Sequence, residues 1–77
     1  MTDEEWQSVL TYVHKRLENE SSFEIKAKTL AAELGIKLPF YKEVRRRLAL
    51  KREFGMRSYV HGEEDGHEPI DTLTFSP

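Results

Sequence analysis

The sequence predicts an α+β fold of three helices and a small antiparallel sheet, in the order helix, short strand, helix, helix, strand, strand. Three stretches space their apolar residues at intervals of three and four, as helices do. Beyond Gly55 the interval becomes two, which is typical of strands. With 77 residues, no internal repeat and no long linker, residues 1–77 have the size of one domain.

The first helix is predicted over residues 3–19. Thr2, followed three residues later by Glu5, matches a capping box at its start. Its apolar stripe consists of Trp6, Val9, Leu10, Val13 and Leu17. Turn-forming residues follow, and residues 23–25 then alternate apolar, charged, apolar. So short a strand needs partners from elsewhere in the chain.

The second helix is predicted over residues 27–34 and ends at Gly35, which readily adopts the left-handed conformation of a helix end. We expect Ile36 to pack back on the last turn of this helix. The third helix is predicted over residues 39–52, because Pro39 suits the first turn, where its missing N–H would have no partner anyway.

The end of the sequence predicts a β-hairpin. Residues 56–61 and 70–75 read as two strands, the second rich in β-branched and aromatic residues. Between them, residues 62–69 form an acidic loop that would be repelled by phosphates.

Positive charge is concentrated in and around the predicted third helix. Positions 37 to 57 hold eight Lys and Arg against two Glu, although the whole chain has a net charge of −2. Positions 58 to 77 hold five acids and neither Lys nor Arg. Clustered like charges destabilise a protein unless a partner neutralises them, and nucleic acid is the commonest polyanion in a cell. A solvated helix face is the alternative explanation.

The helical period divides the third helix into two faces. Four residues would face the core, namely Phe40, Tyr41, Val44 and Leu48. The opposite stripe consists of Lys42, Arg45, Arg46 and Ala49. Arginine pairs bidentately with guanine, so Arg45 and Arg46 are the candidates for reading bases, and Lys42 for a base or a phosphate.

The remaining cations have other expected roles. Glu43 precedes Arg47 by four residues, a spacing that predicts an ordinary ion pair within the helix. Three further cations, Lys51, Arg52 and Arg57, lie where phosphate contacts would set the register without reading sequence. The complete candidate set for DNA contact is Lys37, Tyr41, Lys42, Arg45, Arg46, Ala49, Lys51, Arg52 and Arg57.

Two segments, FEIKAKTLAAELGI and LPFYKEVRRRLALKREFG, resemble the winged helix-turn-helix superfamily of DNA-binding domains. The resemblance implies that the third helix is the recognition helix and that the C-terminal hairpin is the wing. It also implies that residues 23–25 add the third strand of the sheet. The expected function is double-stranded DNA binding, as in a transcriptional regulator.

Alternatives remain open. A protein-interaction module of the same fold, docking an acidic partner through the basic helix, would suit the overall negative charge. RNA binding lacks an aromatic stacking platform on the exposed face. Tyr12 projects away from the apolar stripe of the first helix. The resemblance to winged-helix proteins, whose first helix often mediates dimerisation, implies a homodimer through that helix or a protein partner as a further expectation.

The sequence argues against several other classes of protein. It has no cysteine, no phosphate-binding glycine loop and no catalytic constellation around His14, so we expect no enzyme and no cofactor. Two His and four acids within residues 61–68 fit no known metal-site spacing. No apolar run reaches the ~20 residues that span a bilayer, so we expect a cytoplasmic protein without membrane contact.

Overall fold

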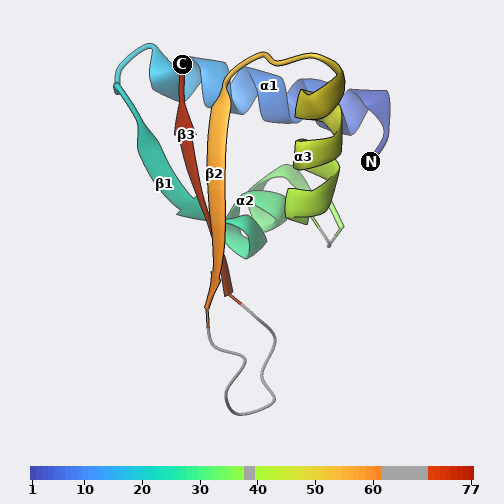
Figure 1. Cartoon of the computed structure of the whole chain (residues 1–77). Helices are drawn as coiled ribbons and strands as arrows, with labels where there is room; N and C mark the ends of the chain where they lie inside the picture. The colour runs from blue at the N-terminus through green and yellow to red at the C-terminus, as the bar shows by residue number, and fades with distance from the viewer. Residues whose placement is uncertain (38–39, 62–69) are drawn as a thin grey trace.

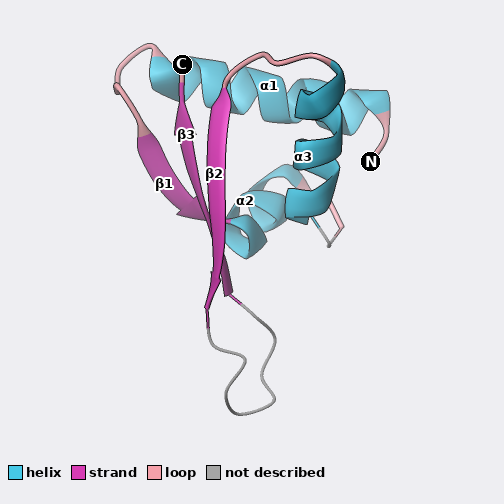
Figure 2. Ribbon diagram, viewed as in Figure 1, coloured by secondary structure: helices cyan, strands magenta, loops and turns pink. Residues whose placement is uncertain are grey.

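The structure, a computed structural model, describes residues 1–37, 40–61 and 70–77. Its elements are α1 (Asp3–Leu17), β1 (Phe23–Lys26), α2 (Ala27–Leu34), α3 (Phe40–Leu50), β2 (Gly55–His61) and β3 (Ile70–Ser76). Figure 1 and Figure 2 show the helices gathered on one side of the strands. The predicted α+β class, three helices with a small antiparallel sheet, is confirmed. Within the described residues, no helix is both long and apolar enough to cross a membrane.

Strand β3 lies at the centre of the sheet, whose antiparallel order is β1-β3-β2. Phe75 of β3 pairs with Phe23 of β1 and with Met56 of β2. Leu73 and Phe75 are fully buried while Thr74 between them is not, so the face that carries Leu73 and Phe75 is the one covered by the helices. The short strand predicted at residues 23–25 thus finds its partner at the far end of the chain.

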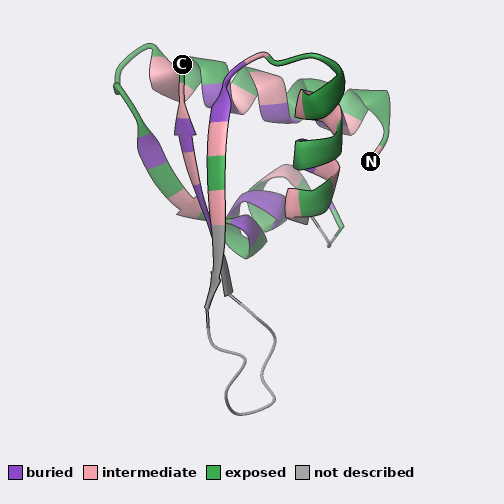
Figure 3. Ribbon diagram, in the orientation of Figure 1, coloured by how far each residue is buried: buried purple, intermediate pink, exposed green. Residues whose placement is uncertain are grey.

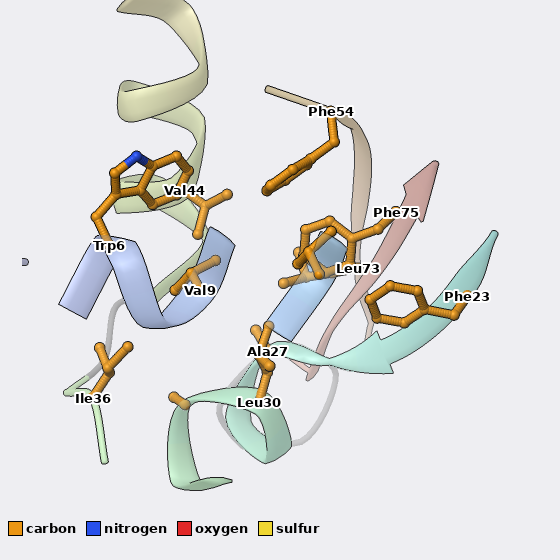
Figure 4. Close-up of a cluster of buried hydrophobic side chains, with 12 residues drawn as sticks. Trp6, Val9, Phe23, Ala27, Leu30, Ile36, Val44, Phe54, Leu73 and Phe75 are labelled. Atoms are coloured by element: carbon orange, nitrogen blue, oxygen red, sulfur yellow. The ribbon is translucent and has the colours of Figure 1, made fainter. Parts of the chain in front are cut away.

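The core lies between this face of the sheet and the three helices (Figure 4). It consists of Trp6, Val9, Val13, Phe23, Ala27, Leu30, Ala31, Ile36, Val44, Phe54, Leu73 and Phe75. The ring of Phe75 lies 5.1 Å from that of Phe23 and 5.4 Å from that of Phe54, centroid to centroid. Val44 is fully buried, and a side chain of this kind contributes about 1.5–3 kcal/mol, so it anchors α3 on the core.

Local signals in the sequence account for two helix ends. The Thr2 hydroxyl accepts a hydrogen bond from the Glu5 N–H, and the Glu5 carboxylate accepts one from the Thr2 N–H, which confirms the capping box. Gly35 has φ 68°, the left-handed conformation expected of it. The Ile36 N–H then donates to the Ala31 carbonyl at 2.9 Å, and Ile36 is buried against the core as predicted.

Two predicted helix ends were too late. Helix α1 ends at Leu17 instead of residue 19, and there the Asn19 amide donates to the Arg16 carbonyl three residues back, the tighter bond of a final turn. Helix α3 ends at Leu50 instead of residue 52. The predicted start of α3 at Pro39 lies outside the described residues.

Strand β2 begins at Gly55, one residue earlier than predicted, where it pairs with Ser76. A Cβ at Gly55 would lie 2.7 Å from the Ser76 hydroxyl oxygen. A larger residue at Gly55 would therefore require the Ser76 side chain to move, whereas the Ser76 carbonyl oxygen would lie at an ordinary contact distance of 3.5 Å.

Candidate nucleic-acid interface

Helix α3 presents the predicted basic stripe to solvent. Lys42, Arg45, Arg46 and Ala49 are all exposed, whereas Val44 is fully buried on the opposite side. Figure 3 shows exposed residues along much of the visible surface of α3. The helical period thus predicted correctly which residues of α3 the fold leaves accessible.

Tyr41 is the candidate residue that belongs to the core side of α3. It is half-buried and packs against the core cluster together with Leu48. The Phe40 side chain, also expected to face the core, is outside the described part of the structure. Tyr41 therefore helps to seat α3 on the core, and only its exposed part is available to a ligand.

The protein's own carboxylates leave most of the stripe unneutralised. Arg46 Nη1 lies 3.8 Å from Glu43 Oε1, but the Arg46 side chain is 72% exposed, so this is a weak, solvent-screened pair. For Lys42 and Arg45 the described residues include no ion-pair partner. Three adjacent cations therefore remain accessible to an anion from solution.

The predicted ion pair between Arg47 and Glu43 is wrong. Arg47 Nη1 instead donates to Asp3 Oδ1 at 2.8 Å, and Nη2 to the Met1 carbonyl at 2.9 Å. Glu43 lies near Arg46 and near the Met1 amino group, whose nitrogen is 3.5 Å from Glu43 Oε2. The packing of the first residues against α3 offers Arg47 two acceptors that helical spacing within α3 could not reveal. Arg47 is thus a structural residue.

The candidates outside the helix are distributed around it. Lys51 follows the end of α3, is exposed, and lies 3.3 Å from Glu53 through its Nζ. Arg52 and Lys37 are exposed in the segments after α3 and before it. Arg52 Nη2 would lie 3.8 Å from a Cβ at Gly55, which places the guanidinium at the start of β2.

Arg57 does not continue the stripe of α3 directly. It pairs with Thr74, on the face of the sheet opposite to Met56 and Ser58. An open groove nevertheless joins α3 to β2, with a volume of about 440 Å³ and a lining of Arg45, Met56, Arg57 and Ser58. Sequence reasoning missed Ser58, although the alternation of strand residues would have placed it beside Met56.

The fully exposed residues of α1 are polar or charged, and its apolar residues Leu10, Tyr12 and Leu17 are partly buried, so the homodimer through this helix stays a prediction. Tyr12 does not project into solvent but is half-buried, with its ring 6.2 Å from that of Phe23. The guanidinium of Arg16 lies 4.1 Å from the centre of the Phe23 ring, and a hydrogen bond to Glu20 raises the pKa of Arg16. The exposed residues of α1 are Asp3, Glu4, Gln7, Ser8, Thr11, His14 and Lys15.

His14 is a surface histidine, as expected. Its Nε2 lies 3.9 Å from Glu53 Oε2, and its ring packs edge-on at 5.7 Å from that of Phe54. Among the side chains that the structure describes, no three His, Asp or Glu lie together as metal ligands would. The expectations for the acidic loop, including its repulsion of phosphates, concern residues 62–69, which lie outside the described residues.

Comparisons of the chain with models of protein families, with curated proteins and with solved structures found no match.

Proposed function

We propose that this chain is a winged helix-turn-helix domain that binds double-stranded DNA, with α3 as its recognition helix, and that it acts as a transcriptional regulator. The observation that carries the proposal is the set of three exposed cations on α3, namely Lys42, Arg45 and Arg46, which the described carboxylates leave accessible. Three helices with a small three-stranded antiparallel sheet are compatible with this fold.

The dimensions and chemistry of α3 suit the major groove of DNA. A helix with its side chains is ~10–12 Å across, and the groove is ~12 Å wide. Ala49 continues the cationic stripe one turn after Arg45, and its small side chain lets this part of the helix approach the base edges. Arginine guanidinium groups then reach guanine O6 and N7, while counterion release supplies most of the affinity. One module this small buries little DNA surface, so tight specific binding would require a dimer or a partner.

A salt series of fluorescence anisotropy titrations with a labelled mixed-sequence duplex tests the proposal. We expect the double variant Arg45→Ala/Arg46→Ala to bind more weakly and to lose up to ~2 from the slope of log K against log salt. Lys15→Ala/Lys26→Ala is the matched control, because it removes two exposed cations from α1 and β1. Absence of binding at low salt, or equal effects of the two double variants, would refute DNA binding by α3.

A second candidate is docking of an acidic protein partner on the same helix. Leu50, at the end of α3, is 83% exposed, and an exposed apolar side chain beside cations suits a protein interface. The two functions make different predictions for Leu50→Ser. It should leave duplex binding unchanged if DNA is the ligand, and it should weaken binding of an acidic protein.

A further inference from the structure

The groove between α3 and β2 has the composition of an anion site. Its described lining is Arg45 from α3 with Met56, Arg57 and Ser58 from β2, and contains no carboxylate. Its two walls come from separate elements, so the packing of α3 beside β2 creates it. A volume of about 440 Å³ in an open groove leaves room for a phosphate group with its substituents.

Arg45 lies at one edge of the cationic stripe, the edge nearest to the core-facing side of α3. At about 100° per residue, Lys42 and Arg46 lie about 60° and 100° around the helix from Arg45. The half-buried Tyr41 and Leu48 lie about 40° and 60° away in the other direction. Lys42 and Arg46 therefore point farthest from the protein, whereas Arg45 lies at the flank beside the groove that it lines.

Ser58 supplies the second polar group. It pairs with the fully buried Leu73, so alternation places its side chain on the helix-facing side of β2, the side of Met56. It is only half-buried, because β2 is an edge strand. Its hydroxyl has no hydrogen-bond partner in the described part of the chain, and is free to donate to a ligand.

We infer that this groove holds a backbone phosphate of the bound duplex, between the Arg45 guanidinium and the Ser58 hydroxyl. Arg45 then sets the position of α3 on the DNA instead of reading a base, and Lys42 and Arg46 are the side chains that face base edges. Arg57, which also lines the groove, adds positive potential at its rim. This inference rests on the proposed function, and it reverses the sequence-based expectation for Arg45.

The test uses a preferred duplex, selected from a random library with the full wild-type chain, and a duplex altered at the selected bases. Arg45→Ala should weaken binding to both by the same factor, about tenfold or more, and reduce the salt slope by about 0.9. Ser58→Ala should weaken binding to both about two- to tenfold and leave the salt slope unchanged, because the hydroxyl is uncharged. Arg46→Ala should instead reduce the ratio of the two affinities.

Controls separate folding from binding. Ser8→Ala removes an exposed hydroxyl on α1 and should leave both affinities unchanged. Circular dichroism should show each variant folded at the assay temperature. An Arg45→Ala variant that changes the ratio of the affinities, or a Ser58→Ala variant that binds like the wild type, would overturn the inference.

Inorganic phosphate distinguishes failure of this inference from failure of the proposed function. If the wild type binds no duplex at low salt, the proposed function fails. In that case, NMR chemical-shift changes of the Ser58 amide on phosphate addition that are lost in Arg45→Ala would show that the groove binds free phosphate. They would overturn the inference that the bound phosphate belongs to a duplex. If the wild type binds duplex, the same Ser58 shift on duplex addition supports the inference, and its absence refutes it.

Discussion

Arg46 and Arg47 are neighbours on α3 that the structure assigns to different tasks. Arg47 donates to Asp3 at 2.8 Å and to the Met1 carbonyl at 2.9 Å, with only 27% of its side chain exposed. Arg46 is 72% exposed, and its one ion-pair partner among the described residues is Glu43, at 3.8 Å. Replacing each by alanine removes the same charge from the same helix. The pair of variants therefore separates a structural contribution from a binding contribution.

The expected magnitudes follow from these contacts. Loss of the hydrogen bond to the Met1 carbonyl costs about 1 kcal/mol. The pair with Asp3 adds about 0–1 kcal/mol, because that carboxylate is 91% exposed. Arg47→Ala should therefore lower the unfolding free energy by about 1–2 kcal/mol, or the Tm by roughly 5–15 °C. Arg46→Ala should change the unfolding free energy by less than about 0.5 kcal/mol.

For duplex binding, Arg46→Ala should have the larger effect and Arg47→Ala the smaller, the reverse of their effects on stability. On the preferred duplex, Arg46→Ala should lose about 1–3 kcal/mol, roughly 5- to 150-fold in affinity. Arg47→Ala should lose less than about threefold at a temperature where it is folded, because its charge is already paired. Urea denaturation followed by circular dichroism measures the unfolding free energy, and fluorescence anisotropy measures the affinity for the duplex. Arg47→Lys keeps the charge without the two-pronged contact, and should fall between wild type and Arg47→Ala in stability.

The outcome that refutes this reasoning is an exchange of roles. Should Arg46→Ala lower the stability as much as Arg47→Ala does, the surface pair with Glu43 would be stronger than its 3.8 Å geometry implies. Should Arg47→Ala weaken duplex binding as much as Arg46→Ala, Arg47 would leave Asp3 in the complex and contact DNA.

Three further predictions concern the scaffold. Leu30 is fully buried, so Leu30→Ala should lower the unfolding free energy by about 2–5 kcal/mol in urea denaturation, and a loss below 1 kcal/mol would contradict the core described above. Gly35→Ala should cost about 1–2 kcal/mol through its φ of 68°, since no atom of the described residues, apart from the chain neighbours of Gly35, lies within 4 Å of an added Cβ, and Gly35→Asn should cost less. The hydrogen bond from the Thr2 N–H lowers the pKa of Glu5 below 4.5 in the folded state, so its stabilisation is present above about pH 4.5 and lost as the pH falls. Stability curves of wild type and Glu5→Gln should therefore converge toward low pH, and curves that stay parallel would contradict this.

The sequence by itself determined the features that depend on residues within a turn or two of each other. Examples are the capping box of Thr2 and Glu5, the left-handed Gly35, and the side of α3 on which Lys42 and Arg46 lie. Each follows from the helical period or from hydrogen bonds over three or four residues, which local sequence encodes. The same reasoning placed helix ends less accurately, because helix ends fray and their last turn often takes a tighter geometry.

Only the tertiary structure decided what distant residues do to one another. Asp3 accepts a hydrogen bond from Arg47, 44 residues away in the sequence, Tyr12 packs edge-on against Phe23, and Arg45 and Ser58 line one groove. These contacts depend on how α1, α3 and the sheet pack, which is set by the shared core and by the strand order β1-β3-β2. Spacing along one helix carries no information about acceptors on another element, so the pairing of Arg47 and the groove beside Arg45 could be found only in the folded chain.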